Sequence, residues 1–156
     1  MASSHSPWAG IAGALVGMAC LLTACTTVPL PATPVVAAVT EQKLLGVEWT
    51  AVAIDGATPV ANPRPTLRWT SPQQMVGVGG CNQFRARVVM GPDSLRIGPI
   101  AGFGTACLSN PSGQEDMFFK ALENTQSARM EDKQLVLMDS AGKVLLRLEP
   151  TSYSAR

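Results

Sequence analysis

The sequence predicts a small α+β domain in which one helix packs on a mainly antiparallel sheet of about seven or eight short strands. Three observations support this fold class. Beyond residue 44, apolar residues mostly alternate with polar ones, as in half-buried strands. Turn residues interrupt these runs at short intervals, and short connections imply antiparallel pairing. A single later segment changes to the helical period, which adds one helix to the sheet.

Five strands are predicted in the first half of the domain. Trp49 is expected to face inward from the first strand, and Ser71-Pro72 is expected to turn the chain between the second and third. Strict alternation from Phe84 to Met90 indicates a half-buried fourth strand. The predicted strands are residues 45–52, 66–70, 75–79, 84–90 and 95–97.

Residues 112–124 are predicted to form the helix. Ser112 and Glu115 have the spacing of a capping box, and Pro111 stands just before them. The apolar residues expected on one face of this helix are Met117, Phe118, Ala121 and Leu122. Strands are expected again at residues 128–130, 135–137 and 144–148, with polar turns between them.

Residues 1–24 are predicted to be a lipoprotein signal peptide. The uncharged apolar run of residues 8–22 is shorter than the roughly 20 residues of a spanning helix and suits a signal-peptide core. It ends at Leu22-Thr23-Ala24-Cys25, which resembles a bacterial lipobox, so Cys25 is expected to carry acyl chains such as palmitate. The alternative is an ordinary secretory signal with an inert cysteine. By resemblance to lipoprotein sorting rules, Thr26 in place of Asp favours the outer membrane, facing the periplasm.

The rest of the chain is divided by composition. Residues 25–40 are uncharged and rich in Pro, Thr, Val and Ala, and Pro29, Pro31 and Pro34 disfavour helix and ladder pairing. We therefore expect a flexible, extended tether there. Residues 41–150 are long enough for one domain, and residues 151–156 form a short tail.

Charge and residue usage exclude several function classes. The 12 basic and 11 acidic residues nearly cancel and aromatic residues are few, so nucleic-acid binding is not expected. Arg85-Ala86-Arg87 is interpreted as a solvated strand face rather than a phosphate site. The only histidine, His5, lies in the predicted signal peptide, so a Ser-His-Asp or Cys-His mechanism would lack its base. No catalytic residue, metal site or cofactor is predicted, and the protein is not expected to be an enzyme.

Cysteine usage suggests one disulfide. With Cys25 acylated, Cys81 and Cys107 remain as an even pair in an oxidising compartment, which favours a bond between them. On the chain-entropy model such a crosslink stabilises the fold by about 3–4 kcal/mol. Two buried free thiols are the alternative, and a thiol-based redox role is a further hypothesis.

Several motifs together resemble a known family. Their order is Leu45-Gly46-x-x-Trp49, Gly79-Gly80-Cys81-Asn82-x-Phe84, Thr105-Ala106-Cys107 and Glu115-x-x-Phe118. This combination is similar to the META-domain family, also called HslJ-like, over residues 45–149. The resemblance implies a small α+β domain, often exported as a lipoprotein and associated with heat shock or envelope stress in bacteria. It implies no established catalytic activity.

The central motif has a physical rationale apart from the family. Gly80 allows a positive φ, Asn82 can bond local backbone groups in a turn, and Phe84 can enter the core. This interpretation is architectural. The alternative is functional, with Asn82 and Arg85 lining a binding cleft.

The sequence therefore predicts an exported, lipid-anchored envelope protein that acts through binding, in heat-shock or envelope-stress tolerance. Its expected partners are the membrane, through Cys25, and an envelope protein or ligand that the sequence does not identify; the chain is expected to be a monomer. The alternative function is inhibition of a periplasmic hydrolase such as lysozyme, with a loop at residues 98–104 entering the cleft of the enzyme.

Overall fold

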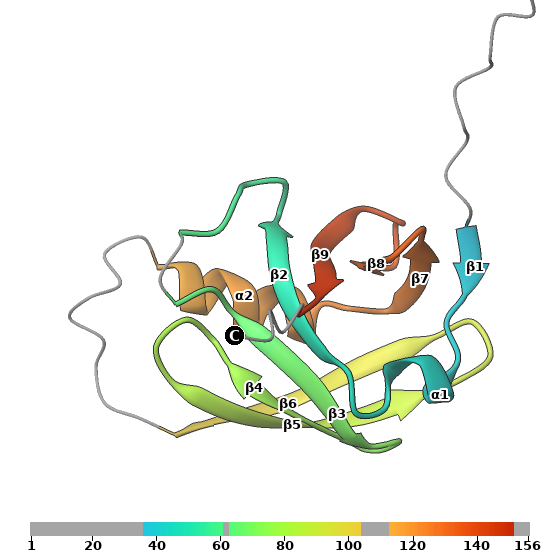
Figure 1. Cartoon of the computed structure of the whole chain (residues 1–156), viewed down its shortest axis with the longest axis horizontal. Helices are drawn as coiled ribbons and strands as arrows, with labels where there is room; N and C mark the ends of the chain where they lie inside the picture. Colours follow the sequence, from blue (N-terminus) through green and yellow to red (C-terminus); the bar gives the residue numbers. More distant parts are fainter. Residues whose placement is uncertain (1–35, 61–62, 104–112, 152–156) are drawn as a thin grey trace, which may run out of the picture. The chain divides into compact units, whose positions relative to one another are not determined.

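The computed structural model describes residues 36–60, 63–103 and 113–151, which form one curled antiparallel sheet with a helix packed on it (Figure 1). Two short helical segments accompany the strands, α1 (Glu41–Leu44) and α2 (Gln114–Glu123). The strands are β1 (Val36–Ala38), β2 (Glu48–Ile54), β3 (Thr66–Ser71), β4 (Gln74–Val78), β5 (Gln83–Met90), β6 (Leu95–Phe103), β7 (Ser127–Glu131), β8 (Gln134–Met138) and β9 (Val144–Pro150).

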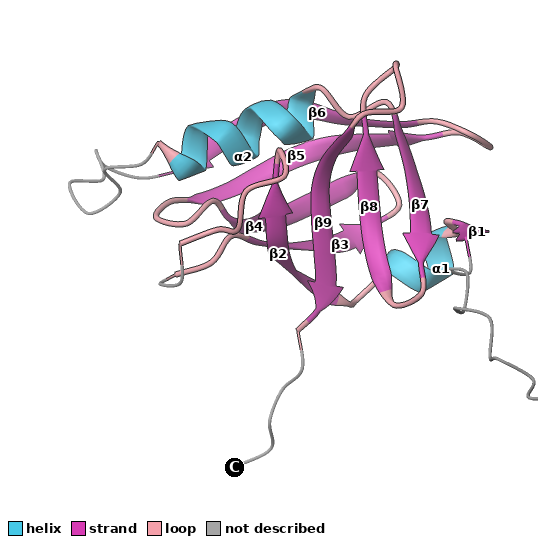
Figure 2. Ribbon diagram, turned by 90° about the horizontal axis from the view of Figure 1, so that it is seen from above, coloured by secondary structure: helices cyan, strands magenta, loops and turns pink. Residues whose placement is uncertain are grey.

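The strand order is β1-β7-β8-β9-β2-β3-β4-β5-β6. Short turns join most neighbours as hairpins, and β9 returns to pair with β2 at the middle of the sheet. The sheet curls into a half-barrel, and α2 packs against β6, β9 and β2 (Figure 2). The eight strands from β2 to β9, together with α2, thus confirm the predicted α+β fold class.

The core lies inside the curl and follows the predicted alternation. Trp49 is 3% exposed, and on β5 the buried Phe84, Ala86 and Val88 alternate with exposed residues. From α2 the core receives Phe118, Ala121 and Leu122. Met117 was expected on the same face, but 43% of it is exposed.

The buried polar member of α2 is Gln114. Its Oε1 accepts a hydrogen bond from the backbone N–H of Val60 at 2.5 Å, which ties the loop after β2 to the start of the helix. The predicted capping box is wrong, because the N-cap of α2 is Gly113 with φ +63° and no side chain caps it. Glu115 bonds to a different part of the chain. Ser112 lies outside the described residues.

Two segments near the N-terminus differ from the sequence-based expectation. The tether was expected to avoid ladder pairing, yet Val36–Ala38 pair with β7 as β1. The three prolines that motivated that expectation all precede this segment. The first strand of the domain begins at Glu48 rather than Leu45, because α1 and the left-handed Gly46 (φ +75°) precede it.

β6 is longer than predicted, and it includes residues that were expected to form a loop. Residues Gly98 to Phe103 continue the strand and pair with β5 as far as Gln83. Pro99 is tolerated because β6 is the edge strand and because the register shifts at this point, where residues 98 and 99 lie opposite Arg87 alone. The described part of the expected 98–104 loop is therefore strand.

Candidate functional site

The segment from Gly79 to Asn82 joins β4 to β5 and is held by one carboxylate of α2. Glu115 Oε2 accepts hydrogen bonds from the backbone N–H groups of Cys81 (3.1 Å) and Asn82 (2.7 Å). Its Oε1 accepts a third bond, from Nδ2 of Asn82 at 2.7 Å. We call this arrangement the Glu115 clamp. Because the carboxylate accepts hydrogen bonds from two backbone N–H groups of the turn, it fixes the loop against the first turn of the helix.

Two glycines make the clamp possible. Gly80 has φ +119°, a conformation that side-chain-bearing residues rarely adopt. At Gly79 an added Cβ would lie 2.6 Å from Cζ of Phe119 and 2.8 Å from Cγ of Glu115. The absence of a side chain at Gly79 therefore lets α2 approach the loop closely.

Aromatic packing completes this architecture. Phe84 meets the ring of Phe118 edge-on at 6.0 Å and that of Phe119 at 5.3 Å between centroids. Of the predicted motif residues, Asn82, Phe84 and Phe118 are thus brought together, whereas Trp49 lies on β2. Asn82 bonds Glu115 of α2, whereas Arg85 stands on the opposite face of β5 from Phe84.

Four arginines stand on the outer face of β3, β5 and β6, and we call this surface the arginine face. Arg68 lies between buried Leu67 and Trp69, and Arg96 lies between buried Leu95 and Ile97. On β5 the exposed arginines alternate with the buried residues. Since side chains alternate across a strand, all four point away from the core. The arginines are Arg68, Arg85, Arg87 and Arg96.

Register places these arginines near one another and near apolar side chains. Val76 of β4 is the Cα partner of both Arg68 and Arg85, so the two arginines flank it. The guanidinium of Arg85 lies 4.4 Å from the ring centroid of Phe103, a cation–π contact. A hollow of about 390 Å³ on this face is lined by Arg68, Val76, Arg85 and Phe103.

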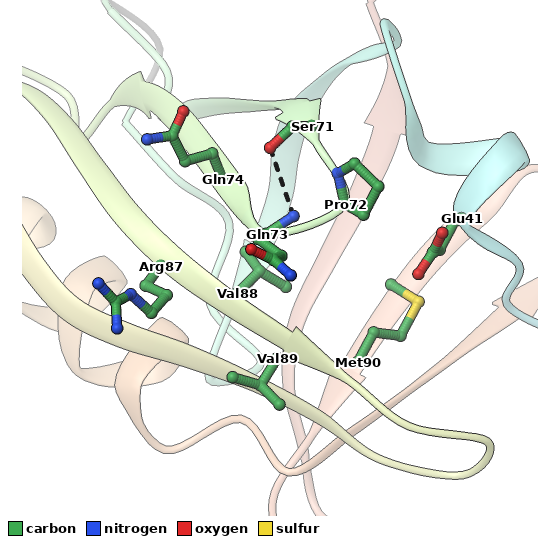
Figure 3. Close-up of a pocket in the computed structure, with 9 residues that line it drawn as sticks. All are labelled: Glu41, Ser71, Pro72, Gln73, Gln74, Arg87, Val88, Val89 and Met90. Atoms are coloured by element: carbon green, nitrogen blue, oxygen red, sulfur yellow. Dashed lines mark hydrogen bonds between the residues drawn. The ribbon is translucent and has the colours of Figure 1, made fainter.

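A second hollow, of about 630 Å³, lies beside the β3–β4 turn. Figure 3 shows Arg87 and Gln74 at one side of this hollow and Glu41 of α1 at the other. Ser71 Oγ accepts a hydrogen bond from the backbone N–H of Gln73 at 3.4 Å and shapes the turn. The side chain of Val89, 61% exposed, also borders the hollow.

In the opposite half of the sheet, two arginines pair with a shared carboxylate. Glu131 pairs with Arg147 at 2.6 Å and also with Arg129. Hydrogen bonds from Arg147 first, and then from Arg129, lower the pKa of the Glu131 carboxyl. Within the described ranges, by contrast, no arginine of the arginine face takes part in an ion pair.

The remaining predicted site residues are only partly placed. Cys81 lies in the clamped loop, whereas Cys25 and Cys107 are outside the described residues, so acylation and the Cys81–Cys107 disulfide stay predictions. Among the described residues, no group of three or more His, Cys, Asp or Glu side chains could hold a metal ion. None of the described helices is long and apolar enough to cross a membrane.

The sequence contained signals for the arginine face and for the Glu115 clamp, although neither was predicted from it. Arg68 and Arg96 each interrupt an apolar pair, as Arg85 and Arg87 do on the strand between them. Periodicity therefore puts each arginine on an outer face, but only the strand order joins the three strands into one surface. Glu115 was identified, but as a local cap.

Comparisons with known proteins agree with this architecture. A protein from Burkholderia xenovorans, solved by NMR, is 24% identical with a TM-score of 0.57, and the match covers 80% of this chain and 100% of that one. A second NMR structure is 17% identical with a TM-score of 0.58, covering 72% and 95%. Both likenesses concern the fold alone, and the curated proteins contain no significant match. The sequence matches the META domain over residues 42–152, a stretch that contains β2 to β9 and α2, so the chain belongs to the META domain family.

Proposed function

We propose that this META-domain protein is exported, anchored by acyl chains on Cys25, and acts by binding rather than by turnover in heat-shock or envelope-stress tolerance. The anchor is supported by the apolar run that ends at Leu22-Thr23-Ala24-Cys25. The stress role is supported by membership of the family. The proposed site of action is the cell envelope, at the outer membrane facing the periplasm.

The observation that carries the binding role is the arginine face. The central motif supports the fold, since Asn82 and Phe84 are both engaged with α2. The arginines of the outer face, in contrast, contribute no ion pair to the fold within the described residues. Exposed, unneutralised charges of one sign are available for a partner of the opposite sign.

Two measurements test this proposal. The intact mass of the mature chain from cells should equal that of residues 25–156 plus acyl groups; an unprocessed chain that begins at Met1 contradicts the anchor. A deletion strain should be more sensitive to heat and envelope-active drugs. Full rescue of that strain by a chain with Arg85→Gln and Arg87→Gln would contradict a role for the arginine face.

The disulfide between Cys81 and Cys107 is part of this proposal. A bond there would fix the clamped loop, and we expect no thiol labelling of the unreduced, unfolded mature chain. Labelling at both cysteines would refute it. The loop proposed for inhibition of a hydrolase is strand in its described part, since Gly98 to Phe103 belong to β6, so the loop no longer supports that alternative.

A further inference from the structure

The arginine face carries an excess of positive charge. Residues 63–103 contain five basic residues, all arginine, and one acidic residue, Asp93. Four of the five stand on the outer face of three strands, as the burial patterns show. Two carboxylates stand beside these arginines. Glu48, the Cα partner of Arg68, lines the same hollow as Arg68 and Arg85, and Glu41 faces Arg87 across the second hollow.

Apolar side chains are interleaved with these charges. Val89 is 61% exposed and is the Cα partner of Arg96, while Phe103 is 49% exposed beneath the guanidinium of Arg85. Arginine, with its apolar stem and planar fork of donors, suits a boundary between an apolar layer and phosphates. Aromatic rings are favoured at the same depth of a membrane interface.

We infer that the arginine face binds anionic phospholipid headgroups at a bilayer surface. The guanidinium groups donate hydrogen bonds to lipid phosphates, and Phe103 and Val89 enter the interfacial layer. This inference rests on the proposed anchoring, which brings the domain to a membrane. It adds a second contact with lipid to the acyl chains, and such paired signals hold proteins at membranes more firmly than one alone.

The geometry favours a bilayer over another polyanion. Arg68 and Arg85 are separated by β4, hence by two strand spacings or about 10 Å, so they can meet separate phosphates. The charges are spread over β3, β5 and the edge strand β6, with β4 between the first two, rather than along one groove.

The test uses residues 33–156, which lack Cys25 and form one compact unit. The Burkholderia xenovorans structure shows that this fold forms in solution as a whole chain. Flotation with vesicles of phosphatidylglycerol and phosphatidylcholine should recover the protein, and pure phosphatidylcholine vesicles should not. Binding should weaken as salt shortens the Debye length from about 10 Å at 0.1 M to about 3 Å at 1 M.

The decisive variant combines Arg85→Gln with Arg87→Gln. Its vesicle partition coefficient should fall about 30-fold, which corresponds to about 1 kcal/mol for each arginine near an anionic surface. The matched control, Lys120→Gln with Lys133→Gln, removes the same charge from exposed positions on α2 and the β7–β8 turn and should bind normally. Arg85→Lys with Arg87→Lys should restore most of the binding, and circular dichroism verifies folding.

Several results would overturn the inference. They are equal binding to neutral vesicles, equal losses in the arginine and lysine variants, and no binding to either vesicle at 0.1 M salt. Binding to heparin or single-stranded DNA that needs Arg85 and Arg87, without vesicle binding, would also overturn it and assign the face to a soluble polyanion. Since Cys25 is absent from this polypeptide, failure here leaves the acyl anchor to be judged by intact mass.

Discussion

The Glu115 clamp provides the sharpest test of how α2 is joined to the sheet. Replacing Glu115 with Ala removes the acceptor of three hydrogen bonds, two from backbone N–H groups and one from Nδ2 of Asn82. A hydrogen bond to a charged group contributes about 1.5–3 kcal/mol when its partner is buried. Cys81 is exposed and Asn82 is half-buried, so water can replace part of what is lost.

We therefore expect Glu115→Ala to lower the free energy of unfolding by about 2–3 kcal/mol, well below the sum of three buried bonds. For a domain of this size the loss corresponds to a fall in Tm of about 10 °C. Urea unfolding followed by circular dichroism measures the first quantity, and a thermal scan measures the second. The slope of the urea transition should not change.

The matched control is Asp116→Ala. Asp116 is the exposed neighbour in the same first turn, so its loss removes the same charge from the positive end of the helix dipole without touching the loop. This variant should lose only about 0.3–1 kcal/mol. Equal destabilisation by the two substitutions would show that helix electrostatics, and not the clamp, accounts for the effect of Glu115.

Other substitutions test the packing and the charge pairing. Gly79→Ala should destabilise the domain by more than about 2 kcal/mol, because the new Cβ would lie 2.6 Å from the ring of Phe119. Gly102→Ala, whose Cβ would lie 3.9 Å from the same ring, should be near neutral, and similar losses for the two glycines would contradict the close-approach argument. Phe118→Ala should cost about 3–5 kcal/mol in urea unfolding, since the side chain is fully buried; a loss below 1 kcal/mol would exclude a tightly packed site. The folded-state pKa of Glu131 is lowered, so its contribution is present above the ordinary pKa of 4.5 and lost as pH falls through the folded value. Glu131→Gln should therefore flatten the acid limb of the stability–pH curve, and an unchanged limb would refute the pairing.

The strands were predictable where burial on one face imposes a period of two. On β5 the printed sequence alternates as the structure does, and Trp49 and Leu146 are buried as their positions in the pattern suggested. The errors fall where the alternation of apolar and polar residues is weak or where a proline interrupts it. The strand that begins at Leu95 was predicted to end at Ile97, but the place of Pro99 at a register shift on the sheet edge lets β6 continue to Phe103.

The site was predictable in composition but not in its contacts. Glu115 and Asn82 were both singled out, one as a helix cap and the other as a turn residue. Their hydrogen bond joins residues 33 positions apart, a separation that local sequence rules do not cover. Likewise, Arg85 and Arg87 were read as an isolated pair, since nothing in their own strand shows that Arg68 and Arg96 stand on the same surface.

The amino-acid sequence alone determines the alternating strands, the single amphipathic helix and the family, because burial periodicity and short motifs are local properties of the chain. Tertiary structure decides the strand order, the packing of α2 against β6, β9 and β2, and the grouping of the four arginines. The physical reason is that the residues next to an outward-facing side chain in the sequence do not determine which side chains lie near it on the surface. Its surroundings are chosen by pairing between distant strands, which the common core enforces.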